Sequence, residues 1–218
     1  MSFTLHADAG ECLAVIGPSG AGKSTLIALI AGFERPLAGR VLIGGRDVTG
    51  LVPAERPVTT LFQEHNLFSH LDVDANVGLG IHPGLRLAAA DRTRVARALA
   101  DVGLAGLGRR LPGQLSGGER QRAALARSLV RNRPVLLLDE PFAALGPALR
   151  SEMLDLVDRL RRRASLTVIM VSHLPEDARR IADRVAFVHA GRVLAVGPTA
   201  ALLDRPLLPE LAAYLGAA

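Results

Sequence analysis

Several residue types are scarce in this chain, and each scarcity excludes a class of protein. The 218 residues include no tryptophan, one tyrosine and one cysteine, and aromatic residues make up only 3%. A single cysteine, Cys12, excludes an internal disulfide and fits a reducing compartment. So few aromatic residues argue against a surface on which nucleic-acid bases stack. The first residues carry no lysine or arginine, so they do not form a secretory signal.

Long apolar runs are also missing. Although 49% of the residues are hydrophobic, the longest runs are about five or six residues, far short of the ~20 that cross a bilayer. The net charge of +5 comes from arginines spread along the chain. The arginine run at 161–163 ends a helical pattern, where cations complement the helix dipole. We therefore expect no nucleic-acid partner.

Short runs rich in Val, Ile and Leu recur between helical patterns and predict buried strands. Continuous apolar runs of this length are typical of strands covered on both faces, as in a parallel sheet. Two glycine-containing turns, at Gly44–Gly45 and near Gly191, predict antiparallel hairpins as well. We therefore predict an α/β fold with a mainly parallel core sheet and antiparallel β additions. The four runs lie at 12–16, 58–62, 134–138 and 167–171.

One part of the chain interrupts this alternation and predicts an inserted helical lobe. Residues 64–111 are rich in Pro, Gly and His and contain one strong helical pattern. That pattern begins at Asp91, the expected N-cap, and stops at Gly103. We expect a single domain over residues 1–218, with a helical lobe of approximately residues 64–130 inserted into the core.

The stretch GPSGAGKST contains the only lysine of the chain, although the other basic side chains are arginines. It follows the strand 12–16 and fits G-x-x-x-x-G-K-[ST], the pattern of a phosphate-binding loop. Small residues let backbone N–H groups surround a polyphosphate, while Lys23 reaches the β- and γ-phosphates and the Ser24 hydroxyl binds Mg²⁺. An arginine suits this place poorly because its planar fork is bulkier than an ammonium group. The predicted binding residues are Gly17, Pro18, Ser19, Gly20, Ala21, Gly22, Lys23, Ser24 and Thr25.

Two carboxylates follow the predicted strand at 134–138. They lie at its C-terminal end, where α/β sheets bind their ligands. Asp139 suits the role of holding Mg²⁺, usually through water. Glu140 is then free to orient and polarise an attacking water as a general base. Acidic residues often follow a strand only because a helix starts there. The acidic pair therefore indicates a catalytic site only in combination with the phosphate loop.

The stretch LSGGERQR, residues 115–122, distinguishes among the classes of P-loop protein. Ser116 and Glu119 form a capping box that opens an amphipathic helix. Gly117 and Gly118 cost roughly 1 kcal/mol each relative to alanine in the first turn. A close approach of the backbone to an anion would explain why two glycines are present in the first turn of a helix. A P-loop kinase or GTPase would leave this stretch unexplained.

With these motifs in this order, the chain resembles the ATP-binding subunits of ABC transporters. The resemblance implies ATP and Mg²⁺ as cofactors and a head-to-tail dimer, in which residues 116–119 bind the ATP held by a second copy. It also implies that Gln63 senses Mg²⁺ and links to the helical lobe. His173 matches the switch histidine that contacts the γ-phosphate and the catalytic water. The implied metal ligands are Ser24, Gln63 and Asp139, and the implied catalytic residues are Glu140, His173 and Gln63.

The phrases FQEHNLFSHL, NVGLG and PGL within 56–87 resemble the ATP-binding subunits of bacterial thiamine and thiamine pyrophosphate importers. In that family this region docks a short helix of the permease. The resemblance implies ATP-driven import through a separate integral membrane permease, with a periplasmic or extracellular solute-binding protein as an indirect partner. The subunit itself would lie at the cytoplasmic face of the inner membrane. Importers of polyamines, iron, sulfate or molybdate are the alternatives, and a non-transport ABC ATPase is a more distant one.

Two features depart from the family pattern. Family members begin with a further strand whose aromatic residue stacks on adenine, whereas Met1 lies only 22 residues before Lys23. We therefore expect a truncated start and do not expect Phe3 to replace the missing ring. Gly146 stands where the family usually carries an aspartate that communicates across the dimer. With glycine at this position, we expect weaker coupling between the two ATP sites of the dimer, without loss of ATP binding.

Overall fold

The structure, a computed structural model, describes residues 1–62 and 67–216 and is built on a six-stranded sheet. The first five strands in spatial order are parallel, and the last is antiparallel to its neighbour. This arrangement confirms the predicted α/β class with a mainly parallel sheet. In spatial order the strands are β4 (Val58–Leu61), β5 (Val135–Asp139), β6 (Thr167–Val171), β1 (Cys12–Ile16), β7 (Arg184–His189) and β8 (Arg192–Pro198).

The predicted strands and hairpins agree with the structure to within about one residue. β1 and β6 have the predicted bounds, and β5 extends to include Asp139. The hairpin of β2 (Leu42–Ile43) and β3 (Arg46–Asp47) turns at Gly44 and Gly45, whose φ angles are 58° and 77°. Two successive residues with positive φ form the tight turn that glycine favours. The β7–β8 hairpin turns at Ala190 and Gly191, as predicted.

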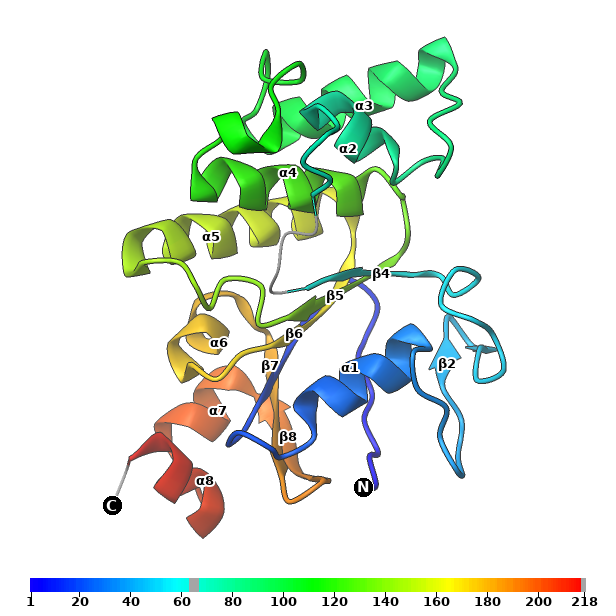
Figure 1. The fold of residues 1–218 in the computed structure, drawn as a ribbon. Coiled ribbons are helices and arrows are strands. Elements are labelled where there is room, and N and C mark those ends of the chain that lie inside the picture. Colours follow the sequence, from blue (N-terminus) through cyan, green and yellow to red (C-terminus); the bar gives the residue numbers. More distant parts are fainter. Residues whose placement is uncertain (63–66, 217–218) are drawn as a thin grey trace.

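Helices cover both faces of the sheet (Figure 1). Leu13 and Val15 of β1 pack in one apolar cluster with Leu26 of α1 (Lys23–Ala31). Ala14 and Ile16, which point the other way, pack in the larger cluster that includes α5 (Pro147–Ala164). That second face is also covered by α6 (Pro175–Ile181), α7 (Thr199–Asp204) and α8 (Pro209–Leu215). Two covered faces explain why the strands read as unbroken apolar runs.

A separate helical lobe lies above the sheet in Figure 1. It contains α2 (Val73–Gly78), α3 (Ala89–Asp101) and α4 (Gly117–Leu129), with a 3₁₀ turn at Pro112–Gln114 before α4. The three helices pack on one another, and their apolar sides join the larger cluster. Within the described ranges, no helix is both long and apolar enough to cross a membrane.

The start of α3 corrects one prediction. Ala88, not Asp91, is the N-cap, because α3 begins with alanines of high helix propensity. Asp91 falls in the first turn, where its Oδ2 accepts a hydrogen bond from the Ala88 backbone N–H at 3.1 Å. The carboxylate therefore still satisfies one free N–H group of the helix start. Gly103 follows the helix with φ +78°, as a stop residue.

A buried arginine anchors the far end of α1. Arg56 is fully buried, and its guanidinium donates to the carbonyl oxygens of Leu29 (2.6 Å) and Ile30 (2.8 Å) in the last turn of the helix. It also donates to the carbonyls of Thr49 and Leu51 in the loop after the β2–β3 hairpin. A cation at a helix C-terminus is stabilised by the helix dipole and satisfies the free carbonyls there. Arg56 thus fixes the helix whose other end forms the candidate site.

Candidate active site

The phosphate loop connects the central strand β1 to the start of α1. Gly17, Gly20 and Gly22 all have positive φ, at 148°, 75° and 102°. A Cβ on Gly17 would lie 2.0 Å from the carbonyl oxygen of Val188, so no other residue fits there. Because three of its glycines adopt conformations that side chains disfavour, the loop can turn its backbone N–H groups toward one centre.

Lys23 is the first residue of α1 and is buried. Its ammonium Nζ donates to the carbonyl oxygens of Gly17 at 2.8 Å and Pro18 at 2.9 Å. Burial lowers the pKa of Lys23, while the negative charges of Glu140 and Asp139 act in the opposite direction. The single lysine of the chain is therefore held over the loop, facing both carboxylates of the site.

Asp139 and Glu140 lie at the C-terminal end of β5. The Ser24 hydroxyl donates to Asp139 Oδ1 at 3.2 Å, which joins the two predicted metal-binding side chains. Burial raises the pKa of Asp139, and the charge of Glu140 adds to that effect. One carboxylate and one hydroxyl are hard oxygen donors, a set that fits Mg²⁺ completed by water and phosphate oxygens.

The backbone of Glu140 is strained. Its φ is +47°, in the left-handed region that only a few per cent of non-glycine residues adopt. The Glu140 N–H donates to Val171 O at 3.1 Å, which ties this turn to the end of β6. Glu140 Oε2 lies 3.3 Å from Nδ1 of His173. A residue held in a conformation that costs about 1–3 kcal/mol is typical of functional sites.

The loop that carries His173 is fixed on both sides. Ser172 Oγ donates to Asp177 Oδ2 at 2.6 Å and accepts from the Leu174 N–H at 3.1 Å. On the other side, the Tyr214 hydroxyl of α8 donates to the carbonyl oxygen of His173 at 2.9 Å. These bonds hold the loop against β6 and α8, with the histidine ring beside Glu140.

Tyr214 is a site residue that no sequence motif indicated. Burial raises its pKa, and a hydrogen bond from the Gly17 backbone partly opposes this shift. Its ring packs on Phe187 of β7, with ring centroids 5.6 Å apart. The phenol therefore touches both the phosphate loop and the His173 loop. The one available signal was that it is the only tyrosine of the chain.

We expect Tyr214→Phe to lower the ATP turnover number about fivefold, because the lost hydrogen bond to the His173 carbonyl contributes about 1 kcal/mol. KM for ATP should change less, since the phosphate loop keeps its glycines and Lys23. Steady-state phosphate release measures both constants. The ring still packs on Phe187, so the thermal midpoint should fall by only about 2–4 °C, which serves as the control. A lower midpoint with an unchanged turnover number would mean that Tyr214 is structural only.

The stretch at 116–119 opens α4 as predicted. Ser116 is the N-cap, its Oγ accepts from the Glu119 N–H at 3.2 Å, and Glu119 Oε2 accepts from the Ser116 N–H at 2.7 Å. The pKa of Glu119 is lowered mainly by that backbone hydrogen bond. A Cβ on Gly118 would lie 3.0 Å from Leu149, whereas a Cβ on Gly117 would meet only the Arg120 guanidinium, in ordinary contact at 3.9 Å. Gly117 is partly exposed, and Gly118 is buried.

The predicted site residues fall into two groups in space. The phosphate loop, Asp139, Glu140 and His173 are joined by contacts at the C-terminal ends of the strands. Ser116, Gly117, Gly118 and Glu119 belong to the helical lobe, away from the loop (Figure 1). Gln63 lies outside the described residues.

Gly146 is the N-cap of α5 and makes no side-chain cap. Its φ of −64° and ψ of 159° suit any residue, and nothing lies within 4 Å of an added Cβ. We therefore expect Gly146→Asp to raise the free energy of unfolding by about 1 kcal/mol, through capping and a less flexible unfolded chain. Urea denaturation measures the change. Gly146→Ala, which cannot cap, should give only part of it.

The same substitution tests the coupling attributed to this position. If the missing carboxylate weakens communication between two sites, Gly146→Asp should raise the cooperativity of ATP hydrolysis, whereas Gly146→Ala should not. The rate is measured as a function of ATP concentration for all three proteins. Identical rates and Hill coefficients for the parent and the aspartate variant would contradict the coupling hypothesis.

A phosphate loop after the central parallel strand, with two carboxylates at the end of another strand, defines a P-loop nucleotide-binding protein. The family profile described as "ABC transporter" matches residues 1–143. The chain therefore belongs to the ABC transporter family and has the fold of its ATPase.

Individual relatives support the same family. The Thiamine import ATP-binding protein ThiQ of Cereibacter sphaeroides is 61% identical over 218 residues, covering 98% of this chain and 94% of its own length. The protein of the same name from Chelativorans sp. is 59% identical over 216 residues, covering 99% and 88%. A solved dimer of the ATP-binding cassette MJ0796, in a post-hydrolysis state with ADP and Pi, matches with a TM-score of 0.77 and 30% identity, covering 89% of this chain and 88% of its own. The resemblance inferred from the motifs is confirmed.

Proposed function

We propose that this chain is the ATP-hydrolysing subunit of a bacterial ABC importer that takes up thiamine or thiamine pyrophosphate through a separate permease. The observation that carries the proposal is identity of about 60% over nearly the whole chain to two proteins named for thiamine import. In this proposal residues 1–218 form one ATP-binding domain, with a helical lobe of approximately residues 64–130.

Residues 17–25 hold the triphosphate of ATP in the proposed site. Lys23 and the N–H groups of the loop balance the charge on the β- and γ-phosphates. Ser24 and Asp139, joined by their hydrogen bond, hold Mg²⁺ together with Gln63. When bound, Mg²⁺ would supply positive charge that offsets the negative charge of the phosphate groups.

Hydrolysis is an in-line attack of water on the γ-phosphorus. Glu140 accepts a proton from the attacking water as the new O–P bond forms. The bond from the γ-phosphorus to the bridging oxygen breaks, and ADP leaves with its electron pair. His173, 3.3 Å from Glu140, positions the γ-phosphate and the water. The strained backbone of Glu140 fixes the direction in which its carboxylate approaches.

A second copy completes each site. The signature residues Ser116, Gly117, Gly118 and Glu119 lie in a different lobe from the phosphate loop of their own chain. In a head-to-tail dimer each set would contact the γ-phosphate held by the partner, and the exposed N-terminus of α4 suits an anion. The dimeric state of the related cassette MJ0796 supports this arrangement.

The permease is proposed to dock on the region of residues 56–87, on the cytoplasmic face of the inner membrane. Phe33 and Phe62 form an exposed aromatic pair there, with ring centroids 5.8 Å apart, and Phe68 is also exposed. Exposed aromatic side chains of this kind are enriched at protein interfaces. The solute-binding protein contacts only the permease.

Complementation tests the assignment. A Cereibacter sphaeroides strain without its own thiamine import ATP-binding protein should regain uptake of labelled thiamine when it expresses this chain. The Lys23→Ala variant serves as the control and should not restore uptake. If the parent chain hydrolyses ATP but does not restore thiamine uptake, and instead restores polyamine or anion uptake in a strain that lacks the corresponding ATP-binding subunit, the thiamine assignment is wrong and the ATPase assignment stands.

A further inference from the structure

One side chain of α4 reaches the turn that follows β5. Gln121 lies two residues after Glu119, in the second turn of α4, and is fully buried. Its side-chain Nε2 donates to the carbonyl oxygen of Pro141 at 2.5 Å. Pro141 directly follows Glu140, the proposed general base. The helical lobe is therefore hydrogen-bonded to the residue next to the proposed catalytic carboxylate.

Side chains bind three successive carbonyl groups of this turn. Gln121 binds the first, that of Pro141. Arg150 of α5 binds the next two, because its guanidinium donates to Phe142 O at 3.1 Å and to Ala143 O at 2.9 Å. The turn is thus fixed from two helices, and the bond from α4 is the one nearest to β5.

The bond from Gln121 acts next to a strained residue. A φ of +47° is costly for Glu140, so its surroundings must hold that conformation. On one side, the Glu140 N–H donates to Val171 O at 3.1 Å. On the other side, the ring of Pro141 fixes its own φ, so a bond to the Pro141 carbonyl also restricts rotation of the peptide that follows Glu140. The backbone of Glu140 is therefore held from both directions.

Stability alone does not explain an amide at position 121. Gln121 Oε1 is buried and accepts no hydrogen bond from any described residue. A buried acceptor without a partner is destabilising, and an apolar side chain of the same length would avoid that cost. What the amide adds is one directional bond to Pro141 O, beside Glu140.

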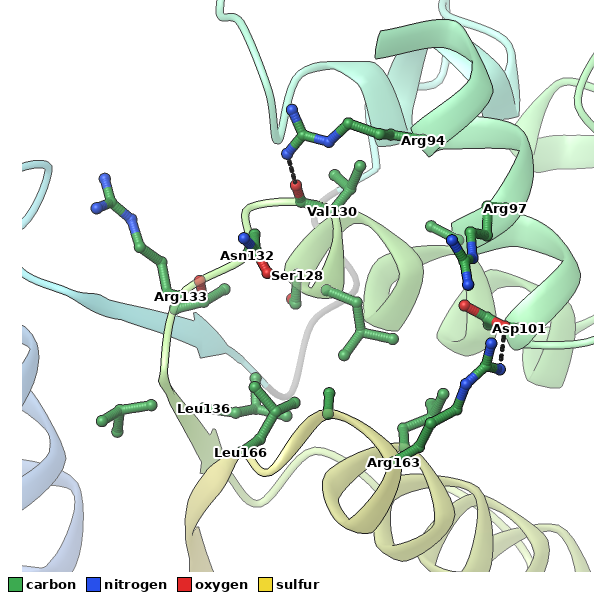
Figure 2. A pocket seen from close by; sticks show the side chains of 16 residues that line it. Arg94, Arg97, Asp101, Ser128, Val130, Asn132, Arg133, Leu136, Arg163 and Leu166 are labelled. Carbon is green, nitrogen blue, oxygen red and sulfur yellow. Dashed lines mark hydrogen bonds and ion pairs between the residues drawn. The ribbon is translucent and has the colours of Figure 1, made fainter. Parts of the chain in front are cut away.

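At their other ends, α4 and β5 are separated by a cavity of about 400 Å³ (Figure 2). Ser128 and Val130, from the end of α4 and its C-cap, line one side of the cavity. Leu136 of β5 and Leu166 line the other. The bond from Gln121 thus links α4 to the end of β5 that carries the candidate active site, away from the cavity.

We propose that Gln121 is a positioning residue for ATP hydrolysis. Its amide holds the Pro141 carbonyl, and thereby directs the carboxylate of Glu140 at the attacking water. This role rests on the proposed function of Glu140 as the general base. Because Gln121 acts through Glu140 and does not contact the phosphate loop, its loss lowers the turnover number and leaves the affinity for ATP unchanged.

The first test is the variant Gln121→Met, which keeps the length and burial of the side chain but cannot donate a hydrogen bond. We expect its turnover number to fall about tenfold, since a misplacement of 1 Å can cost about 10²-fold. KM for ATP should stay the same, and the thermal midpoint should move by less than about 4 °C. Gln121→Leu, a second apolar replacement, should give the same result. The matched control is Gln114→Met, at an exposed glutamine just before α4, which should keep the parent turnover number.

A double-mutant cycle separates positioning of Glu140 from a purely structural role. If Gln121 acts through the Glu140 carboxylate, Gln121→Met should change the remaining rate of a Glu140→Gln chain by less than about twofold. A tenfold loss in both backgrounds, an equal loss in Gln114→Met, or parent-like turnover of both Gln121 variants would each overturn the proposal. Undiminished hydrolysis by Glu140→Gln alone would overturn the role of Glu140 as well, so the two failures are distinguishable.

Discussion

Replacing Lys23 with alanine is expected to lower ATP hydrolysis at least about 100-fold while the chain stays folded. The ammonium group donates to two carbonyls of the phosphate loop, and removing a single preorganised donor from such a site costs about 10²–10³ in turnover. The fold should tolerate the change because alanine has the highest helix propensity and Lys23 begins α1. Phosphate release measures turnover, and circular dichroism with thermal unfolding checks the fold.

Lys23→Arg is the matched control for charge. It keeps the positive charge, but its planar fork is bulkier than an ammonium group that is buried between two loop carbonyls. We therefore expect it to remain nearly inactive. Substantial hydrolysis by Lys23→Arg would mean that charge alone is sufficient, and substantial hydrolysis by Lys23→Ala would mean that the loop does not hold the reacting triphosphate.

The strands could be predicted from the sequence because strands buried on both faces consist of unbroken runs of apolar residues. The runs at 12–16 and 167–171 match β1 and β6 without a shift. No local sequence pattern indicates the order of the strands in the sheet, since β1 pairs with β6 and β7, which follow it by more than 150 residues. Pairings of that kind depend on the packing of the whole chain, and no local pattern of hydrophobicity encodes them.

The motifs indicated the types of the site residues but not how they are held. Glycine spacing and the position after a strand were enough to predict the phosphate loop and the two carboxylates. The left-handed backbone of Glu140 and the phenol of Tyr214 behind His173 could not be predicted, because both depend on neighbours distant in sequence. Arg56 is similar, since nothing nearby indicates that this arginine is fully buried against the end of α1.

Glu140→Gln is expected to lower hydrolysis by about 10²–10³ while ATP binding survives. Glutamine has nearly the same shape as glutamate and can still contact His173, whose Nδ1 lies 3.3 Å from Glu140 Oε2. Unlike glutamate, it cannot accept the proton of the attacking water. The substitution also leaves Lys23, Ser24 and Asp139 in place, so the triphosphate should still be held. Phosphate release gives the rate, and equilibrium dialysis with labelled ATP gives the affinity.

Slow hydrolysis should make the dimer visible. If each ATP joins the phosphate loop of one copy to the signature residues of another, a variant that binds ATP without consuming it accumulates as a dimer by mass action. Light scattering coupled to gel filtration should therefore report twice the chain mass for Glu140→Gln in ATP, and the monomer mass in ADP. The double variant Lys23→Ala/Glu140→Gln should stay monomeric in ATP, because it lacks the cation that holds the triphosphate. A monomer of Glu140→Gln at saturating ATP would contradict the shared site, since the signature residues would then have no nucleotide to contact.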